Sequence, residues 1–256
     1  MQQRTVWEGD TPYGHYQVVD CLYDSRPARV LYSGKRQAAQ SGIATDDQPD
    51  LLFDYNQRMF ELTMSLAPER ILLIGGAVLT LPAALLRTLP EVHIDVVEPD
   101  EGLTRLAHTY FDVPVDDRLN VFHTDGRSFL REHAKRYDLI LVDAFTHTAI
   151  PKELRTVEFF QALNKHLGDK GTVAMNVISG YHGNGAQILS QVYAAALQSF
   201  DVVDIFLASR GYSLWLPQNF VLTAQKGTDF PFKDYVRYEA VAPPEVAPES
   251  ALRDDE

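Results

Sequence analysis

The stretch Arg70-Ile-Leu-Leu-Ile-Gly-Gly-Ala77 and the later stretch Val96-Val-Glu98-Pro-Asp100 decide the fold of this chain. An apolar run that stops at two glycines and leads into a helical pattern is typical of a strand, a tight turn and a helix. Glycines there let a ligand approach the backbone, and a carboxylate at the tip of the next strand, about 20 residues on, can accept hydrogen bonds from both ribose hydroxyls. The pair predicts a nucleoside-bearing cofactor. The alternative is a purely structural turn, since any tight turn can use glycine.

After Pro68 the chain alternates between strand patterns and helix patterns. Such alternation, with right-handed crossovers, predicts a Rossmann-like, doubly wound parallel sheet of the α/β class. The closing runs 202–208 and 220–224 are joined without a helix, so we expect them to be antiparallel neighbours. The other expected strands are 71–75, 93–97, 119–123, 137–142 and 172–177, and the expected helices are 79–88, 101–111, 127–133, 157–167 and 186–200.

The two ends of the chain differ in composition from this middle part. Short β-type runs at 16–23 and 28–32, with turns at Ser33-Gly34 and Ser41-Gly42 and a helix over about 49–66, predict a small antiparallel β unit. We therefore divide the chain into an N-terminal β-hairpin domain with a linking helix (1–66), a nucleoside-cofactor domain (67–228) and an acidic, Pro-rich tail predicted to be disordered (229–256).

Composition excludes several kinds of partner. The formal net charge of −12 argues against nucleic acid, whose phosphates would be repelled. The single cysteine, Cys21, excludes an internal disulfide and a Cys-based metal set, and favours a reducing, cytoplasmic setting. The N-terminus lacks the apolar segment of a signal peptide, and the apolar stretch 71–86 is too short and too interrupted to span a membrane.

Groups suited to a polar ligand stand where the predicted parallel strands end. Ligands of doubly wound sheets bind at this edge. The groups are Gly75-Gly76, Glu98, Asp125-Gly126, Asp143 and Asn176.

Each carboxylate among these groups has two interpretations. Glu98 and Asp125 can contact a nucleoside, or they can cap the helices that come next in the chain. Asp143 comes after the fully apolar run Leu139–Val142, so it should be partly desolvated, which raises a carboxyl pKa and makes it a better proton acceptor. The alternative for Asp143 is that it bonds loop amides.

Other chemistry finds little support. His147 is a second candidate for proton transfer, and His15, His182 and Tyr212 lie in predicted loops that could flank the site. There is no H-E-x-x-H metal pattern and no G-x-S-x-G elbow, and Cys21 has no evident base partner. We therefore expect neither metal nor covalent catalysis.

With these residues in view, the segment from about Tyr13 to Gln225 resembles the spermidine synthase family of polyamine aminopropyltransferases. The resemblance lies in motifs that succeed one another in register. These are Tyr16-Gln17 for the family's Y-Q, Ile74-Gly-Gly-Ala-Val-Leu-Thr80 for I-G-G-G-D-G-G, Val97-Glu98-Pro-Asp100 for V-E-I-D, Asp125-Gly-Arg-Ser-Phe-Leu130 for D-G-R-x-F-L, Val142-Asp143 for the start of V-D-S-S-D-P, and Glu158-Phe-Phe160 for E-F-Y.

The resemblance implies a methyltransferase-type Rossmann-like domain behind a small β domain, a homodimer, an amine or other nucleophilic acceptor, and decarboxylated S-adenosylmethionine or S-adenosylmethionine as cofactor, with no metal. It also implies a role for each matching residue. Asp143 would be the catalytic base, Glu98 would hold ribose, Asp125 and Gly126 would hold adenine, Gly75 and Gly76 would admit the cofactor's tail, and Gln17 would help from the N-terminal domain.

Three of the motifs depart from the family's pattern. Val78 stands where the family has an aspartate that meets the cofactor's amino end, Thr146 replaces the second aspartate of D-S-S-D, and Asn56-Gln57 replaces the His-Glu of Y-H-E. A desolvated ammonium without a partner is costly. These changes argue against putrescine as the acceptor, while the nucleoside half of the site is retained.

Three functions remain open at this point. The first is an aminopropyltransferase of the spermidine synthase type. The second is a methyltransferase that uses intact S-adenosylmethionine on a non-polyamine acceptor, which Val78 and Thr146 favour. The third is a nucleoside-binding homologue without catalysis.

Overall fold

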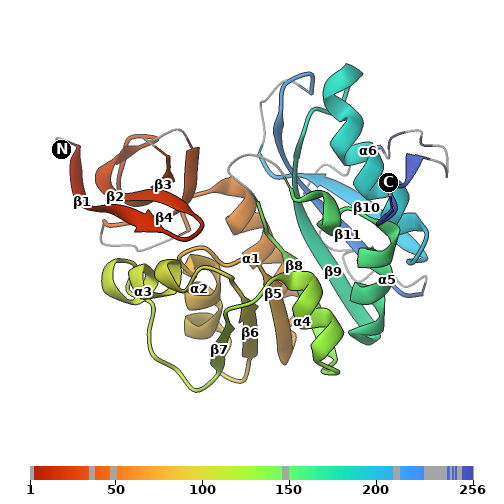
Figure 1. Cartoon of the computed structure of the whole chain (residues 1–256), viewed down its shortest axis with the longest axis horizontal. Coiled ribbons are helices and arrows are strands. Elements are labelled where there is room, and N and C mark those ends of the chain that lie inside the picture. The colour runs from red at the N-terminus through yellow and green to blue at the C-terminus, as the bar shows by residue number, and fades with distance from the viewer. Residues whose placement is uncertain are drawn as a thin grey trace.

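The structure is a computed structural model that describes residues 3–34, 38–46, 51–145, 150–209, 214–227, 241–242, 244, 246 and 250–255. Its strands form one four-stranded and one seven-stranded sheet, and no helix in the described part is long and apolar enough to span a membrane (Figure 1). The strands are β1 (Arg4–Thr11), β2 (Gly14–Tyr23), β3 (Arg26–Ser33), β4 (Ala38–Ala44), β5 (Arg70–Ile74), β6 (His93–Val97), β7 (Leu119–Phe122), β8 (Tyr137–Val142), β9 (Leu167–Ser179), β10 (Val202–Leu207) and β11 (Gln218–Gln225). The α-helices are α1 (Asp54–Leu66), α2 (Thr80–Thr88), α3 (Glu101–Tyr110), α4 (Gly126–Glu132), α5 (Val157–Lys165) and α6 (Gln187–Leu197).

The seven-stranded sheet has the order β10-β11-β9-β8-β5-β6-β7. Strands β7, β6, β5, β8 and β9 pair in parallel, whereas β11 runs antiparallel to both β9 and β10. The predicted doubly wound sheet and its antiparallel closing pair are therefore confirmed. Because β5 lies between β6 and β8, the strand order reverses beside β5, where such sheets bind ligands.

Helices cover both faces of this sheet. Side chains of α4, α5 and α6 pack into one buried cluster with Leu72 and Ile74 of β5, while side chains of α1, α2 and α3 pack into another with Ile71 and Leu73. Successive residues of β5 thus point to opposite faces, and both faces are buried, which explains its unbroken apolar sequence.

The four-stranded sheet, order β1-β2-β3-β4, is antiparallel and lies beside α2 and α3 in Figure 1. Several side-chain hydrogen bonds join it to the larger domain, and one of them runs from the Arg29 guanidinium to Tyr110 O (3.0 Å). The Thr11 hydroxyl donates to Asp100 Oδ2 (2.5 Å), and the Ser41 and Thr80 hydroxyls lie 3.0 Å apart. The predicted N-terminal antiparallel β unit is confirmed, and α1 packs against the larger sheet through Met59.

Two local predictions are wrong. Ser41-Gly42 lies inside β4 and makes no turn, because Gly42 packs so closely that a Cβ there would lie 3.1 Å from the carbonyl oxygen of Arg29. Strand β9 starts earlier than expected, at Leu167, because pairing with β8 continues across an irregularity in register.

The last described residues, 250–255, contact the start of α5. The Val157 amide donates to Leu252 O (2.9 Å), and the Thr156 hydroxyl donates to Asp254 Oδ1 (2.7 Å). The disorder predicted for the C-terminal tail therefore does not hold for this part, because the contacts depend on partners about 100 residues away that composition does not reveal.

The turn after β5 is strained. Ala77 and Leu79 have φ angles of 44° and 57°, in the left-handed region, and Val78 between them is fully buried. That region costs a residue with a Cβ about 1–2 kcal/mol. The I-G-G-G-D-G-G motif of the spermidine synthase family has glycine at the positions of both Ala77 and Leu79. This chain therefore has the same turn without the glycines that adopt its φ angles most easily.

We expect Ala77→Gly to raise the free energy of unfolding by about 1 kcal/mol, because glycine adopts this φ without a Cβ clash. Urea denaturation measures the change. The matched control is Ala84→Gly inside α2, which should lower the free energy of unfolding by about 1 kcal/mol. A loss of stability in both variants would contradict strain at residue 77.

Candidate functional site

The end of β5 sets the position of Asp143. The Asp143 amide donates to Ile74 O (2.8 Å), and a Cβ added at Gly75 would lie 2.3 Å from the carbonyl oxygen of Asp143. Gly75 also has a φ of 84°, which favours glycine. The first glycine of the turn is therefore required for packing between strand ends, whatever the ligand.

Glu98 holds the same turn from the neighbouring strand end. Its Oε2 accepts hydrogen bonds from the amides of Gly76 (3.1 Å) and Ala77 (2.9 Å), and its Oε1 accepts one from Asp100 (3.0 Å). Burial raises the pKa of Glu98, and the three amides act in the opposite direction. Oε1 retains acceptor capacity for a ligand hydroxyl.

A cavity of about 440 Å³ lies over these strand ends. The N-terminal sheet supplies one side of it through Tyr13, Gly14, Tyr16, Ser33 and Gln40. Five of the predicted site residues line it together, namely Gly75, Glu98, Asp125, Gly126 and Asp143.

Two predicted site residues are not among the described residues that line this cavity. Gln17 comes directly after Tyr16 in β2, and because side chains alternate along a strand, Tyr16 and Gln17 point to opposite faces. Gly76 faces Val96 and Leu79, either of which a Cβ would approach within 2.8 Å, and only its amide is directed to Glu98.

Asp125 caps α4, as one of its two interpretations predicted. Its Oδ1 accepts a hydrogen bond from the Ser128 amide (2.9 Å), and that bond contributes most to lowering the Asp125 pKa. Because Asp125 also lines the cavity, capping and ligand contact are compatible.

Asp143 is partly exposed and lines this cavity, and in the described part of the chain its carboxyl is bonded by neutral side chains. Asn176 Nδ2 donates to Asp143 Oδ1 (2.9 Å), and Asn219 Nδ2 donates in turn to Asn176 Oδ1 (2.9 Å). Burial raises the pKa of Asp143 to about 6, against smaller lowering effects of Asn176 and of the Tyr55 hydroxyl. A carboxyl with this pKa can accept a proton near neutral pH.

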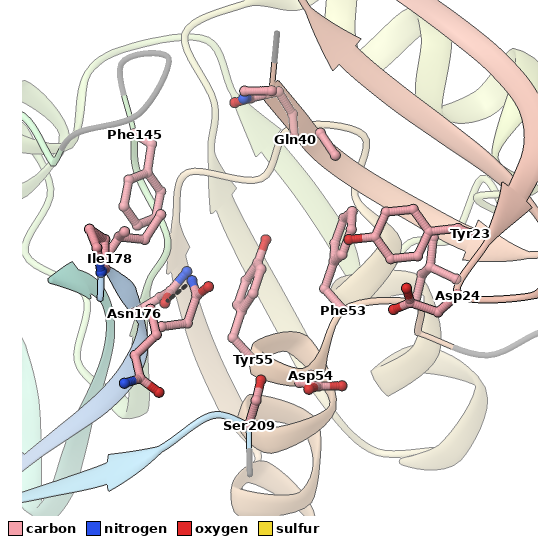
Figure 2. Close-up of a pocket in the computed structure, with 16 residues that line it drawn as sticks. Tyr23, Asp24, Gln40, Phe53, Asp54, Tyr55, Phe145, Asn176, Ile178 and Ser209 are labelled. Atoms are coloured by element: carbon pink, nitrogen blue, oxygen red, sulfur yellow. Dashed lines mark hydrogen bonds between the residues drawn. The ribbon is translucent and has the colours of Figure 1, made fainter. Parts of the chain in front are cut away.

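A second cavity, of about 410 Å³, adjoins the first. Gln40, Tyr55 and Phe145 line both cavities, and Asn176 lines the second. Since Tyr55 and Asn176 both hydrogen-bond to Asp143, the desolvated carboxyl lies between the two spaces. Figure 2 shows Tyr55 between Phe145, Asn176 and Ile178 on one side and Phe53, Tyr23 and Asp24 on the other.

Several residues of this second cavity belong to no motif that the sequence reveals. Asp24, in the turn between β2 and β3, and Asp54, at the start of α1, both line it. Asn219 is reached through antiparallel pairing of β11 with β9, and no motif in the sequence indicates that it lies near Asp143. Tyr55 matches the tyrosine of the family's Y-H-E motif, and this match could have indicated that Tyr55 lies in the site.

The remaining candidates are placed elsewhere. His15 bonds Asp10 and Glu8 on the surface, and the His182 ring lies against Trp215. Thr146, His147 and Tyr212 lie outside the described residues. In the described ranges no three His, Cys, Asp or Glu side chains gather as metal ligands would.

We expect the raised pKa of Asp143 to appear as a pH dependence of stability. The folded state holds the proton of the Asp143 carboxyl more tightly than the unfolded chain does. The contribution of this protonation to the free energy of unfolding is therefore complete below about pH 4 and is lost as pH rises through about 6. Relative to Asp143→Asn, the wild type should lose up to about 3 kcal/mol of unfolding free energy between pH 4 and 6.5.

Urea denaturation at several pH values tests this. Asp117→Asn, a change at an exposed carboxyl before β7, should track the wild-type curve. If the Asp143→Asn curve ran parallel to the wild type, the carboxyl would not be desolvated in solution.

Comparisons with known proteins agree with this architecture. The spermine/spermidine synthase domain model matches residues 52–203. A probable polyamine aminopropyl transferase of Bifidobacterium longum is 35% identical over 192 residues, which are 74% of this chain and 42% of that protein. The chain thus spans less than half the length of this relative.

Two solved structures share the fold. A probable spermidine synthase from Corynebacterium glutamicum superposes with a TM-score of 0.76 at 19% identity, covering 88% of this chain and 81% of that one. A spermidine synthase in complex with the transition state analogue AdoDATO superposes with a TM-score of 0.69 at 20% identity, covering 90% of this chain and 76% of that one. The family model, matched over more than half of the sequence, confirms the resemblance: this chain belongs to the spermine/spermidine synthase family.

Proposed function

We propose that this chain transfers an aminopropyl-type group from an S-adenosyl donor to an amine, with Asp143 as the general base. The observation that carries the proposal is the place of Asp143, a desolvated carboxyl between two adjoining cavities. Curated relatives named polyamine aminopropyltransferases, and a structural neighbour bound to a transition state analogue, support the same class of reaction.

The residues of the first cavity fit such a donor. Glu98 would accept from the ribose hydroxyls, Asp125 and Gly126 would contact adenine, and Asp143 lines the same cavity beside Gly75. The carboxylates along this cavity would also attract the positive charge of a sulfonium. When bound, decarboxylated S-adenosylmethionine supplies a carbon activated by its sulfonium, and no metal is required.

The protein's part in the reaction is positioning and proton transfer. The amine nitrogen loses its proton to Asp143, its lone pair forms the new N–C bond, and the C–S bond breaks with its electrons going to sulfur. The Asn219–Asn176 pair orients the Asp143 carboxyl, since each amide donates to the next group. Holding both reactants in line contributes most of the acceleration expected for such a step.

The second cavity supports an acceptor with two cationic ends. Its wall is a run of aromatic rings: Tyr55 stacks on Phe53 (centroids 6.0 Å apart), and Phe53 meets Tyr23 edge-on (5.3 Å). Aromatic faces suit an alkylammonium chain. Asp24 and Asp54 also line this cavity, and Figure 2 shows both on the side of Tyr55 away from Asn176. They would pair with the distal ammonium in place of the acidic groups missing from the family motifs.

The same proposal includes the wider setting of the protein. Residues 1–66 and 67–228 would work as two domains, with a homodimer formed through the N-terminal sheet. A reducing, cytoplasmic compartment would keep the buried Cys21 a thiol. Nucleic acids and membranes would not be partners.

Methyl transfer from intact S-adenosylmethionine is the second candidate, and the position of Val78 favours it. Val78 is fully buried in the core, so the turn offers no carboxylate at this position to the amino end of a decarboxylated donor. Calorimetry with both donor forms separates the two reactions, because methyl transfer requires preference for the carboxylated form. A homologue without catalysis would bind 5′-methylthioadenosine and turn over no amine with either form.

We expect Asp143→Asn to abolish amine turnover while binding of 5′-methylthioadenosine stays within about threefold of wild type, since a general base contributes about 10²–10⁴ in rate. Mass-spectrometric product detection and calorimetry give the two readouts. Wild-type turnover should also rise as pH increases through about 6, where Asp143 loses its proton. Unchanged turnover in the variant would exclude Asp143 as the base.

We expect the double variant Asp24→Asn, Asp54→Asn to raise the KM for a linear diamine about five- to tenfold, because two exposed charge pairs are lost. Turnover of a monoamine of equal length should not change. Asp117→Asn removes an exposed carboxyl elsewhere and serves as the control. Equal changes for both amines would show that these carboxylates do not recognise the distal charge.

A further inference from the structure

Ser33 lines the first cavity and carries a buried hydroxyl that is unsatisfied among the described residues. It is the last residue of β3, it is 5% exposed, and its Oγ has no hydrogen-bond partner within the described part of the chain. A buried hydroxyl without a partner destabilises the folded state unless a ligand completes its hydrogen bond.

The pairing of the N-terminal sheet fixes the direction of Ser33. Ser33 pairs directly with Tyr16 across β3 and β2. Side chains of paired residues in antiparallel strands lie on the same face. Tyr16 lines the cavity too, so residues of two neighbouring strands border the space where the donor is proposed to bind.

The strand order locates Ser33 along the donor. Burial raises the pKa of Tyr16 of β2, and the nearby charges of Asp100 and Glu98 raise it further, so Tyr16 lies at the proposed ribose end. Gln40 of β4 has no partner residue in β3, because the register shifts between Leu31 and Tyr32. Gln40 lines both cavities, so it lies near the place where they adjoin. Strand β3 runs between β2 and β4. Ser33 would therefore lie over the part of a bound donor between its ribose and its reacting carbon.

A ligand group in that stretch lacks the partner that the family motif would provide. Val78 replaces the acidic residue of the glycine turn and is sealed in the core. The donor's tail would end in an ammonium, which needs an acceptor once it is removed from water. A serine hydroxyl can both accept from an ammonium and donate to a neighbouring acceptor.

We infer that Ser33 binds the terminal amino group of the donor's tail, as a neutral acceptor in place of the absent carboxylate. This rests on the proposed function, because it assumes that an S-adenosyl donor occupies the first cavity. Ser33 thereby recognises the tail and not the nucleoside.

The test is calorimetry on Ser33→Ala with two ligands. Affinity for decarboxylated S-adenosylmethionine should fall about three- to tenfold, the range for one hydrogen bond. Affinity for 5′-methylthioadenosine, which has no amino group on its tail, should not change. The unfolding free energy of the ligand-free protein should stay the same or rise, because an unsatisfied buried hydroxyl has been removed.

Ser41→Ala is the matched control. Ser41 is equally buried, but its hydroxyl is bonded to Thr80, so its loss should lower stability and leave both affinities unchanged. Three outcomes would overturn the inference: no loss of donor affinity in Ser33→Ala, an equal loss for both ligands, or a loss of stability like that of Ser41→Ala.

The two proposals fail differently. If the wild type binds the donor and turns over no amine, the transfer function fails and the Ser33 contact is still decided by the affinities. If amines are turned over and Ser33→Ala binds the donor normally, only the Ser33 assignment fails. If the wild type binds neither ligand, both fail.

Discussion

The close contact between Gly75 and the backbone of Asp143 is the constraint on which the candidate site depends. Strands β5 and β8 end side by side, and any side chain at residue 75 would displace the end of β8. One contact thus sets both the floor of the first cavity and the position of the desolvated carboxyl. Binding and proton transfer are coupled through packing, before any ligand is considered.

Two desolvated carboxylates near this contact differ because their partners differ. Glu98 accepts three backbone amides, which stabilise its charged form and tie it to the turn. Asp143 accepts from the neutral side chains of Asn176 and Tyr55, so burial dominates and its pKa reaches about 6. The first arrangement suits a fixed hydrogen-bond acceptor, and the second suits a group that exchanges a proton.

Features that depend on local pattern could be predicted from the sequence. Strands buried on both faces read as apolar runs, and their ends carry polar groups, so Glu98 and Asp143 were found at the correct edge. Strand β4 was missed because Ala38–Ala44 is small and polar, and its fit depends on contacts with α2. Asp24 and Ser33 could not be assigned to cavities, because the packing of one sheet on another domain decides where they point.

The residues around the first cavity are tightly packed, whereas the acidic residues of the second cavity are exposed. This difference explains how the first cavity could be retained while the second changed. Around the first, a Cβ at Gly75 or Gly126 would come within 2.6 Å of neighbouring atoms, so those positions admit almost no substitution. The acidic residues of the second, Asp24 and Asp54, are exposed and stand at a turn and at a helix start. Exposed carboxylates can be gained or lost at little cost to the fold. Recognition of the acceptor can therefore move to new residues while the nucleoside half of the site stays as the packing requires.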